Sequence, residues 1–139
     1  MSIDFVIMGS NKQVQVYSNR QVCNQSQFRS TRQFMEYLCL QNGTTLDGGY
    51  KASGNLLKNK YKRPIYIGGS CNQIFVPISS IKNINTTWIS LDYLLDLDEQ
   101  FLLDMVNEPI SKTRLQKHLI NGIELKKAIF NHDKKETFK

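Results

Sequence analysis

The densest group of side chains able to bind an anion lies between residues 50 and 63. Its basic members are Lys51, Lys58, Lys60, Lys62 and Arg63, and they are interleaved with Tyr50, Asn55, Asn59 and Tyr61. Lysine and arginine neutralise phosphates and release condensed counterions, which gives affinity that depends little on base sequence. Tyrosine and asparagine add hydrogen bonds to a phosphate backbone or to base edges. These residue types at this spacing favour contact with a nucleic-acid backbone.

A second group repeats the mixture in the segment 79–87, SSIKNINTT, where Lys82 is followed by Asn83 and Asn85. We predict that both groups form one binding surface. Its phosphate contacts are Lys51, Lys58, Lys60, Lys62, Arg63 and Lys82, and the side chains near bases are Asn83 and Asn85. No helix-turn-helix or zinc-finger motif is visible. A protein that contacts DNA through loops and strands is expected to prefer the narrow, strongly negative minor groove of A/T-rich DNA.

The signs of the charges are segregated along the chain. There are 18 Lys and Arg against 12 Asp and Glu, which gives a net charge of +6. Every charged residue from Gly48 to Leu91 is basic, whereas the segment 92–108 is purely acidic. Its members are Asp92, Asp96, Asp98, Glu99, Asp104 and Glu108. This segregation favours an anionic partner, although cations that only maintain solubility remain an alternative. The acidic segment is a candidate surface for a protein partner.

The acids also raise the alternative of a nuclease, because paired carboxylates bind Mg²⁺. A metal site needs carboxylates that converge from different elements, and these belong to one local segment. The spacing of Asp92, Asp96 and Glu99 is equally typical of a solvated helix face. We therefore expect no metal site and no cofactor.

Nucleophilic catalysis needs a nucleophile with a base in reach. We expect His118 on the water-facing side of a helix and His132 in the tail, so that neither activates Cys39. The spacing of Cys23, Cys39 and Cys71 fits neither a disulfide framework nor a zinc site. We interpret all three as small apolar residues in a reducing compartment and expect no catalytic residue, so that the chain is not an enzyme.

Hydrophobic patterns predict the elements that carry these groups. Residues 3–8 and 13–17 read as two strands, and 18–30 as a loop. Ser30 caps a helix that runs to Gln41. The glycine-rich stretch 43–60 reads as a loop with a short helix around 51–58.

The second half is predicted to begin with a hairpin in which the strand IYIG pairs with the strand QIFVPI. A further strand is predicted over 86–94. Residues 100–106 fit a last strand or a helix. Ser111 caps a final helix with Arg114, Lys117 and Lys127 outside its apolar face. That face consists of Leu115, Leu119, Gly122, Ile123, Ile129 and Phe130.

Together these elements predict an α+β fold. It has a twisted, mostly antiparallel β-sheet with two principal helices, including an amphipathic C-terminal helix. We expect one domain over residues 1–139, with 131–139 as a frayed tail. The N-terminus lacks the pattern of a signal peptide and no apolar run is long enough to span a bilayer, so a cytoplasmic location without membrane contact is expected.

Five short motifs occur in an order that resembles the ComK family of competence transcription factors. They are C-x3-G-T-T-x3-G from Cys39 to Gly49, K-R-P-I-x-I, N-Q-I-F, S-S and W-I-S. The resemblance is best over residues 39–92 and weaker to about residue 130. Pro109-Ile110-Ser111 and the helix after it are similar to a later P-I-S and helix of that family.

The resemblance implies a DNA-binding activator that recognises A/T-rich boxes through the minor groove and acts as a homo-oligomer on DNA-uptake genes. The chain departs from the family pattern by being shorter, with trimmed strands after Trp88. The departure leaves activator, repressor and accessory roles open. The alternative is a protein-interaction module, an inhibitor or adaptor of mobile-element origin, that uses the acidic segment.

Overall fold

The computed structural model describes residues 2–57, 63–106 and 109–137. Within them a six-stranded sheet has the order β3-β2-β1-β6-β5-β4, and every neighbouring pair is antiparallel. The strands are β1 (Phe5–Met8), β2 (Val14–Ser18), β3 (Gln21–Gln25), β4 (Ile65–Ile67), β5 (Gln73–Pro77) and β6 (Trp88–Ser90). The helices are α1 (Thr31–Gln41), α2 (Leu46–Leu57), α3 (Leu91–Leu95), α4 (Glu99–Met105) and α5 (Lys112–Thr137). The predicted α+β class and the C-terminal helix are confirmed.

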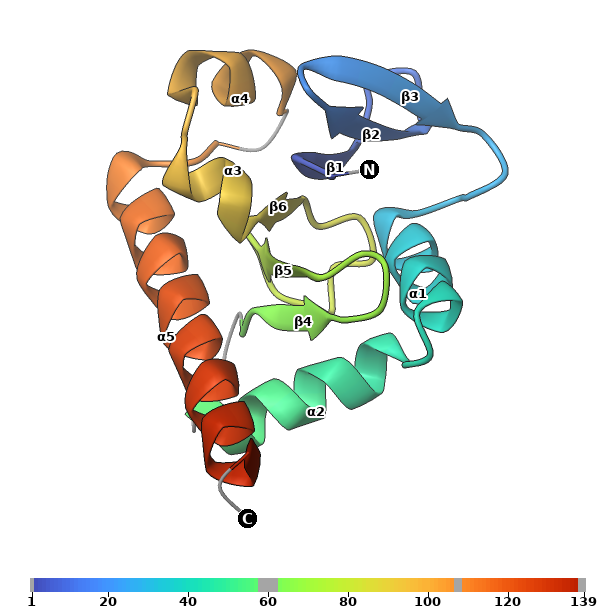
Figure 1. Ribbon diagram of the computed structural model, residues 1–139. Coiled ribbons are helices and arrows are strands. Elements are labelled where there is room, and N and C mark those ends of the chain that lie inside the picture. Colours follow the sequence, from blue (N-terminus) through green and yellow to red (C-terminus); the bar gives the residue numbers. More distant parts are fainter. Residues whose placement is uncertain (1, 58–62, 107–108, 138–139) are drawn as a thin grey trace.

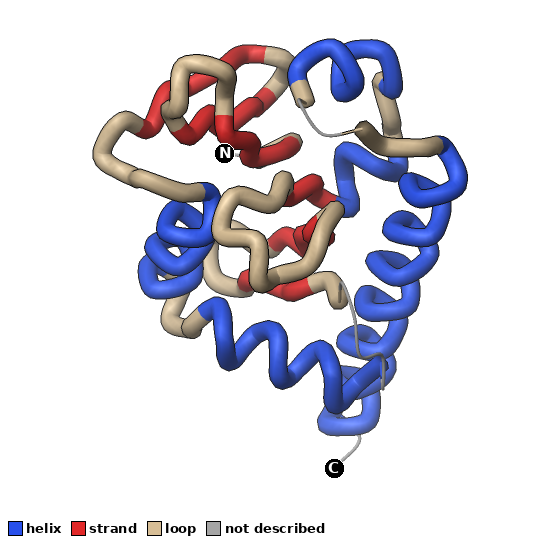
Figure 2. Tube along the Cα trace, turned by 180° about the vertical axis from the view of Figure 1, so that it is seen from behind, coloured by secondary structure: helices blue, strands red, loops and turns tan. Residues whose placement is uncertain are grey.

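Helices cover both faces of the sheet (Figures 1 and 2). Because side chains alternate along a strand, Val6 and Phe5 supply opposite cores. Val6 belongs to a cluster with Phe34 and Met35 of α1 and with Leu46 of α2. The cluster of Phe5 lies on the other face and draws on α3, α4 and α5. A small third cluster joins Ile74, Leu91 and Leu125 beneath α5.

The prediction for residues 18–30 was wrong, because β3 follows β2 directly. Asn19 and Arg20 have φ of 51° and 63°, and the pair Ser18↔Gln21 closes the hairpin around them. Two positive φ values define the type I′ turn that suits a right-handed twist. The Asn-Arg pair is a weaker sign of this turn than Asn-Gly, and β3 has no buried apolar alternation.

Helices replace two of the loops and strands that the sequence predicts. α2 spans twelve residues and begins at Leu46, where the sequence predicts a loop with a short helix around 51–58, because it packs against β4 and α5 despite its glycines. The strand expected over 86–94 ends at Ser90, whose side chain caps α3 by accepting from the Tyr93 N–H at 3.1 Å. Residues 100–106 resolve as the helix alternative, α4, capped by Asp98.

The buried face of α5 is also displaced from the predicted one. His118 is only 4% exposed, so its placement on the wet side was wrong, whereas Phe130 is 65% exposed. Arg114 is half-buried and donates to the Ile78 carbonyl at 3.1 Å. The helix therefore presents the line of Leu115, His118, Gly122 and Leu125 to the sheet and to α3.

Candidate nucleic-acid interface

The basic group of residues 51–63 begins on α2. Lys51 projects from the helix with its side chain 74% exposed, and its ammonium lies 3.1 Å from the Asp47 carboxylate one turn earlier. An exposed pair of this kind is weak and screened by salt, so the ammonium remains able to exchange Asp47 for a phosphate. Lys58, Lys60 and Lys62 lie outside the described residues.

Arg63 has a geometry that the sequence did not predict. Its guanidinium carbon lies 3.9 Å from the centre of the Tyr50 ring on α2. A Cβ atom added to Gly54 would lie 2.8 Å from the same carbon. The guanidinium therefore lies flat against α2, in a cation–π contact that the missing side chain at Gly54 permits. Arg63 is half-buried and ties the entrance of β4 to α2.

The second group lies on the β5–β6 loop, beside the start of α1. The hydroxyl of Thr31 donates to the Ile84 and Thr86 carbonyls at 3.2 and 2.7 Å. The Arg32 N–H donates to the same Ile84 carbonyl at 3.0 Å. Lys82 is exposed at the tip of this loop.

The side chains of the two asparagines of the loop differ in their hydrogen bonds. Asn83 donates to the Ser79 hydroxyl at 3.2 Å and accepts from the Asn85 N–H at 3.0 Å. The side-chain oxygen of Asn85 is buried, with no hydrogen-bond partner among the described residues. The Asn83 amide therefore shapes the loop in this conformation.

Two arginines that were not predicted join Lys82 at the start of α1. Arg29 is exposed just before the Ser30 cap, and Arg32 lies in the first turn, 3.1 Å from Glu36. The first turn of α1 has no acid. This arrangement forms a second basic region, which we call the α1 start: Arg29, Arg32 and Lys82. Tertiary bonds from Thr31 and Arg32 bring the Lys82 loop to the two arginines, so a local sequence pattern gives no sign of the complete region.

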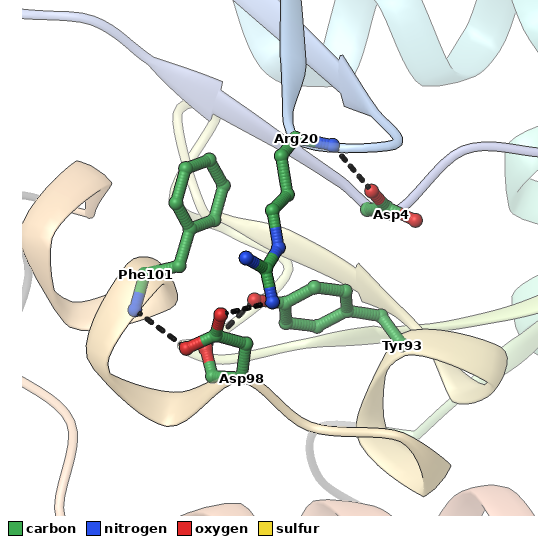
Figure 3. Close-up of polar contacts among 5 residues, drawn as sticks. All are labelled: Asp4, Arg20, Tyr93, Asp98 and Phe101. Atoms are coloured by element: carbon green, nitrogen blue, oxygen red, sulfur yellow. Dashed lines mark hydrogen bonds and ion pairs between the residues drawn. The ribbon is translucent and has the colours of Figure 1, made fainter.

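Among the described residues, the acidic segment 92–108 forms an ion pair with an arginine from another part of the chain. Arg20, at the tip of the β2–β3 turn, forms an ion pair with Asp98, and its guanidinium carbon lies 5.9 Å from the centre of the Phe101 ring (Figure 3). Asp98 also caps α4 through the Phe101 N–H at 3.1 Å, and its carbonyl accepts from the Tyr93 hydroxyl at 2.8 Å. The ion pairs of the described residues join none of these acids to Lys51 or Lys82.

The groups first considered for catalysis are dispersed. In the described part of the chain no three His, Cys, Asp or Glu side chains gather as a metal ion requires. Burial raises the pKa of the Cys39 thiol to about 11, helped by the nearby Cys71 and Glu36, and burial also raises the pKa of Cys71. All three cysteines are free, and Cys23 is exposed on β3 rather than packed as a small apolar residue. Among the described helices, none is both long and apolar enough to span a bilayer.

A comparison with family models finds one that is described as ComK protein and that matches residues 4–134. Neither the curated proteins nor the solved structures gave a match. The match begins just before β1 and ends in α5, so it includes both basic regions. The chain therefore belongs to the ComK family of competence transcription factors.

Proposed function

We propose that the chain binds double-stranded DNA as a regulator of competence genes in the cytoplasm. It prefers A/T-rich sites, reads them through the minor groove and acts as a homo-oligomer. The observation that carries this proposal is the family membership of nearly the whole chain. The exposed cations on α2 and at the α1 start support it physically, because affinity for DNA comes mainly from phosphate neutralisation.

The α1 start supports phosphate contact through charge. The positive end of the helix dipole attracts anions and the basic side chains beside it add charge, whereas the Arg32 and Gln33 N–H groups already donate to the Ile84 carbonyl and the Ser30 hydroxyl. Arg32 and Lys82 supply that charge from segments 50 residues apart in the sequence. Lys51, Lys58, Lys60, Lys62 and Arg63 are the proposed second set of backbone contacts.

Asn83 and Asn85 are the proposed contacts near bases. The present hydrogen bonds of Asn83 set a condition, because the loop has to release the Asn83 amide before that amide can reach a base edge. Lys82 needs no such release and is the residue of this loop that we propose to enter the groove first. We also propose that residues 1–139 act as one DNA-binding domain; the frayed tail over 131–139 stays a prediction.

A gel-shift titration tests the proposal. A/T-rich and G/C-rich duplexes are titrated at low and moderate salt. We expect tighter binding to the A/T-rich duplex and a steep loss of affinity with salt for both. Equal affinity for the two duplexes would reject the A/T preference, and no binding at low salt would reject DNA binding.

The contribution of residues 58–62 can be measured by changing Lys58, Lys60 and Lys62 together to Gln. If all three contact phosphates, the slope of log affinity against log salt falls by about 2.7, because each contact contributes about 0.9. The matched control changes Lys112, Lys117 and Lys127 of α5 to Gln, which lowers the net charge by the same three units. An equal effect of both variants would assign the attraction to total charge rather than to this segment.

A second candidate function is protein interaction through α3 and α4. The observation that favours it is the exposure of three leucines among the acids: Leu95 is 53%, Leu97 36% and Leu103 38% exposed. Apolar side chains rimmed by charge are typical of a protein interface. Absence of DNA binding in the low-salt titration would favour this candidate.

A further inference from the structure

The strand β3 forms one border of the sheet. It is last in the strand order, and among the described strands it pairs only with β2. Figures 1 and 2 both show it along the outer border of the molecule, with its far side facing away from the fold. Four of its five residues are exposed, including Val22 at 47%.

The hairpin turn fixes which backbone groups of β3 point outward. Ser18 and Gln21 flank a two-residue turn and are therefore a hydrogen-bonded pair, and such pairs alternate along an antiparallel ladder. Gln21, Cys23 and Gln25 thus direct their backbone groups to β2. Val22 and Asn24 direct their N–H and C=O groups away from it.

This edge lacks the features that usually prevent strand pairing. In natural proteins, edge strands are protected from pairing by charged residues, by proline, by bulges or by being very short. β3 has five residues, QVCNQ, with no charged residue and no proline, in a chain whose net charge is +6. An open groove of about 590 Å³, lined by residues that include Val16, Phe34 and Leu38, runs beside the strand. The side chains of β3 therefore cause no charge repulsion when a second strand approaches this border.

We propose that β3 pairs with β3 of a second copy of this chain, antiparallel and centred on Cys23. Val22 of each copy then exchanges two hydrogen bonds with Asn24 of the other. The strand is self-complementary because its two outward residues lie at equal distances from Cys23. The two Cys23 residues face each other as a non-hydrogen-bonded pair, with Cα atoms about 4.5 Å apart.

The symmetry of this pairing has a consequence for the helices. A two-fold axis perpendicular to the sheet leaves its faces in place, so α1 of both copies lies on the same face of one twelve-stranded sheet. The α1 start of each copy is then on that face too. This pairing supplies an interface for the homo-oligomer proposed above and rests on that part of the proposed function, but it does not depend on DNA binding.

The first test measures mass in solution without DNA, by sedimentation over a range of concentrations. Asn24→Pro removes one outward N–H from each copy, and Asn24→Ala is the matched control that keeps it. Both lose the 3.3 Å bond from Gln15 to the Asn24 side chain equally. Proline is tolerated on an edge strand whose N–H faces outward, so the fold survives.

We expect wild type and Asn24→Ala to dimerise, and Asn24→Pro to raise the dissociation constant about tenfold or more, since two hydrogen bonds per dimer are lost. A wild type that stays monomeric at all concentrations overturns the proposal. So does a proline variant that keeps its circular dichroism spectrum and dimerises as tightly as Asn24→Ala.

The second test uses the wild-type fold and reads the register. Mild oxidation should join two copies through Cys23, because the paired geometry falls within the range of a disulfide. Cys23→Ser should abolish the cross-link and retain the dimer. In that background, Gln21→Cys mixed with Gln25→Cys should cross-link, whereas each alone should not. A cross-link in Gln21→Cys alone, or none through Cys23, overturns the pairing centred on Cys23.

Discussion

Asp98 shows how much one side chain contributes at the residue scale. Its carboxylate caps α4 and pairs with Arg20, while its carbonyl accepts from Tyr93. Three segments meet there: the β2–β3 turn, α3 and α4 (Figure 3). A residue that the sequence offered as part of an acidic partner surface is therefore in part a structural junction.

The two roles of the Asp98 carboxylate can be separated by substitution. Asparagine caps a helix as well as aspartate does, so Asp98→Asn removes only the ion pair and should lower the free energy of unfolding by less than about 1 kcal/mol. Asp98→Ala also removes the cap and should cost about 1 kcal/mol more. Urea unfolding at low and high salt measures both, and the loss in Asp98→Asn should disappear at high salt. Equal losses in the two variants would contradict this division.

Single residues were the least predictable part of the candidate site. The sequence identified Lys51 and Lys82 as exposed cations, and both are exposed. It could not predict that Arg63 would lie on Tyr50, because this contact needs the gap at Gly54. The bonds of the Asn83 amide likewise depend on the shape of a loop that is bonded to the start of α1.

At the scale of elements, Gly122 sets how closely α5 approaches α3. A Cβ at this position would lie 2.8 Å from the Cδ1 atom of Leu91, which is itself buried in the small cluster with Ile74 and Leu125. The sequence placed this glycine on the apolar face of the helix. The structure supplies the reason, since the missing side chain allows the two helices to touch.

Gly122→Ala should therefore destabilise the fold although alanine favours helices. Overpacking typically costs 1–3 kcal/mol and the gain in helix propensity offsets about 1 kcal/mol of it, so we expect a net loss of about 1 kcal/mol. Thermal and urea unfolding measure the change. In a Leu91→Ala background the same substitution should become neutral or stabilising, and additive effects of the two substitutions would contradict the contact.

Elements with a strong local signal were predicted and the others were not. The helix after Ser30 and the first hairpin have caps, turn residues and alternation that point to one structure. α3 and α4 are short and amphipathic over few residues, so their pattern does not distinguish helix from strand. β3 has no buried face of its own, and only its turn and its neighbour define it.

At the scale of the whole molecule, the buried thiol and phenol couple folding to pH. Burial raises the pKa of Cys39 from its ordinary 9.0 to about 11. Burial, with Asp98 and Asp4 nearby, raises the pKa of Tyr93 from 10.0 to about 12. The folded chain keeps these protons over a range in which the unfolded chain releases them, so stability falls as pH rises from about 9 towards 12.

Urea unfolding at a series of alkaline pH values measures this coupling. We expect the free energy of unfolding to begin to decrease near pH 9, and Cys39→Ala to flatten the decrease between pH 9 and 11. The variant serves as its own control at neutral pH, where the thiol is protonated in both states. An unchanged slope in Cys39→Ala would contradict the assignment.

The junction between β6 and α3 also limits where this chain can vary in length. Ser90 is at once the last residue of the strand and the cap of the helix, so no spare residue separates them. One inserted residue would rotate the helix by about 100° and carry Leu91 and Leu94 away from their buried positions. A single-residue insertion at this junction should therefore destabilise the fold more than one in an exposed loop.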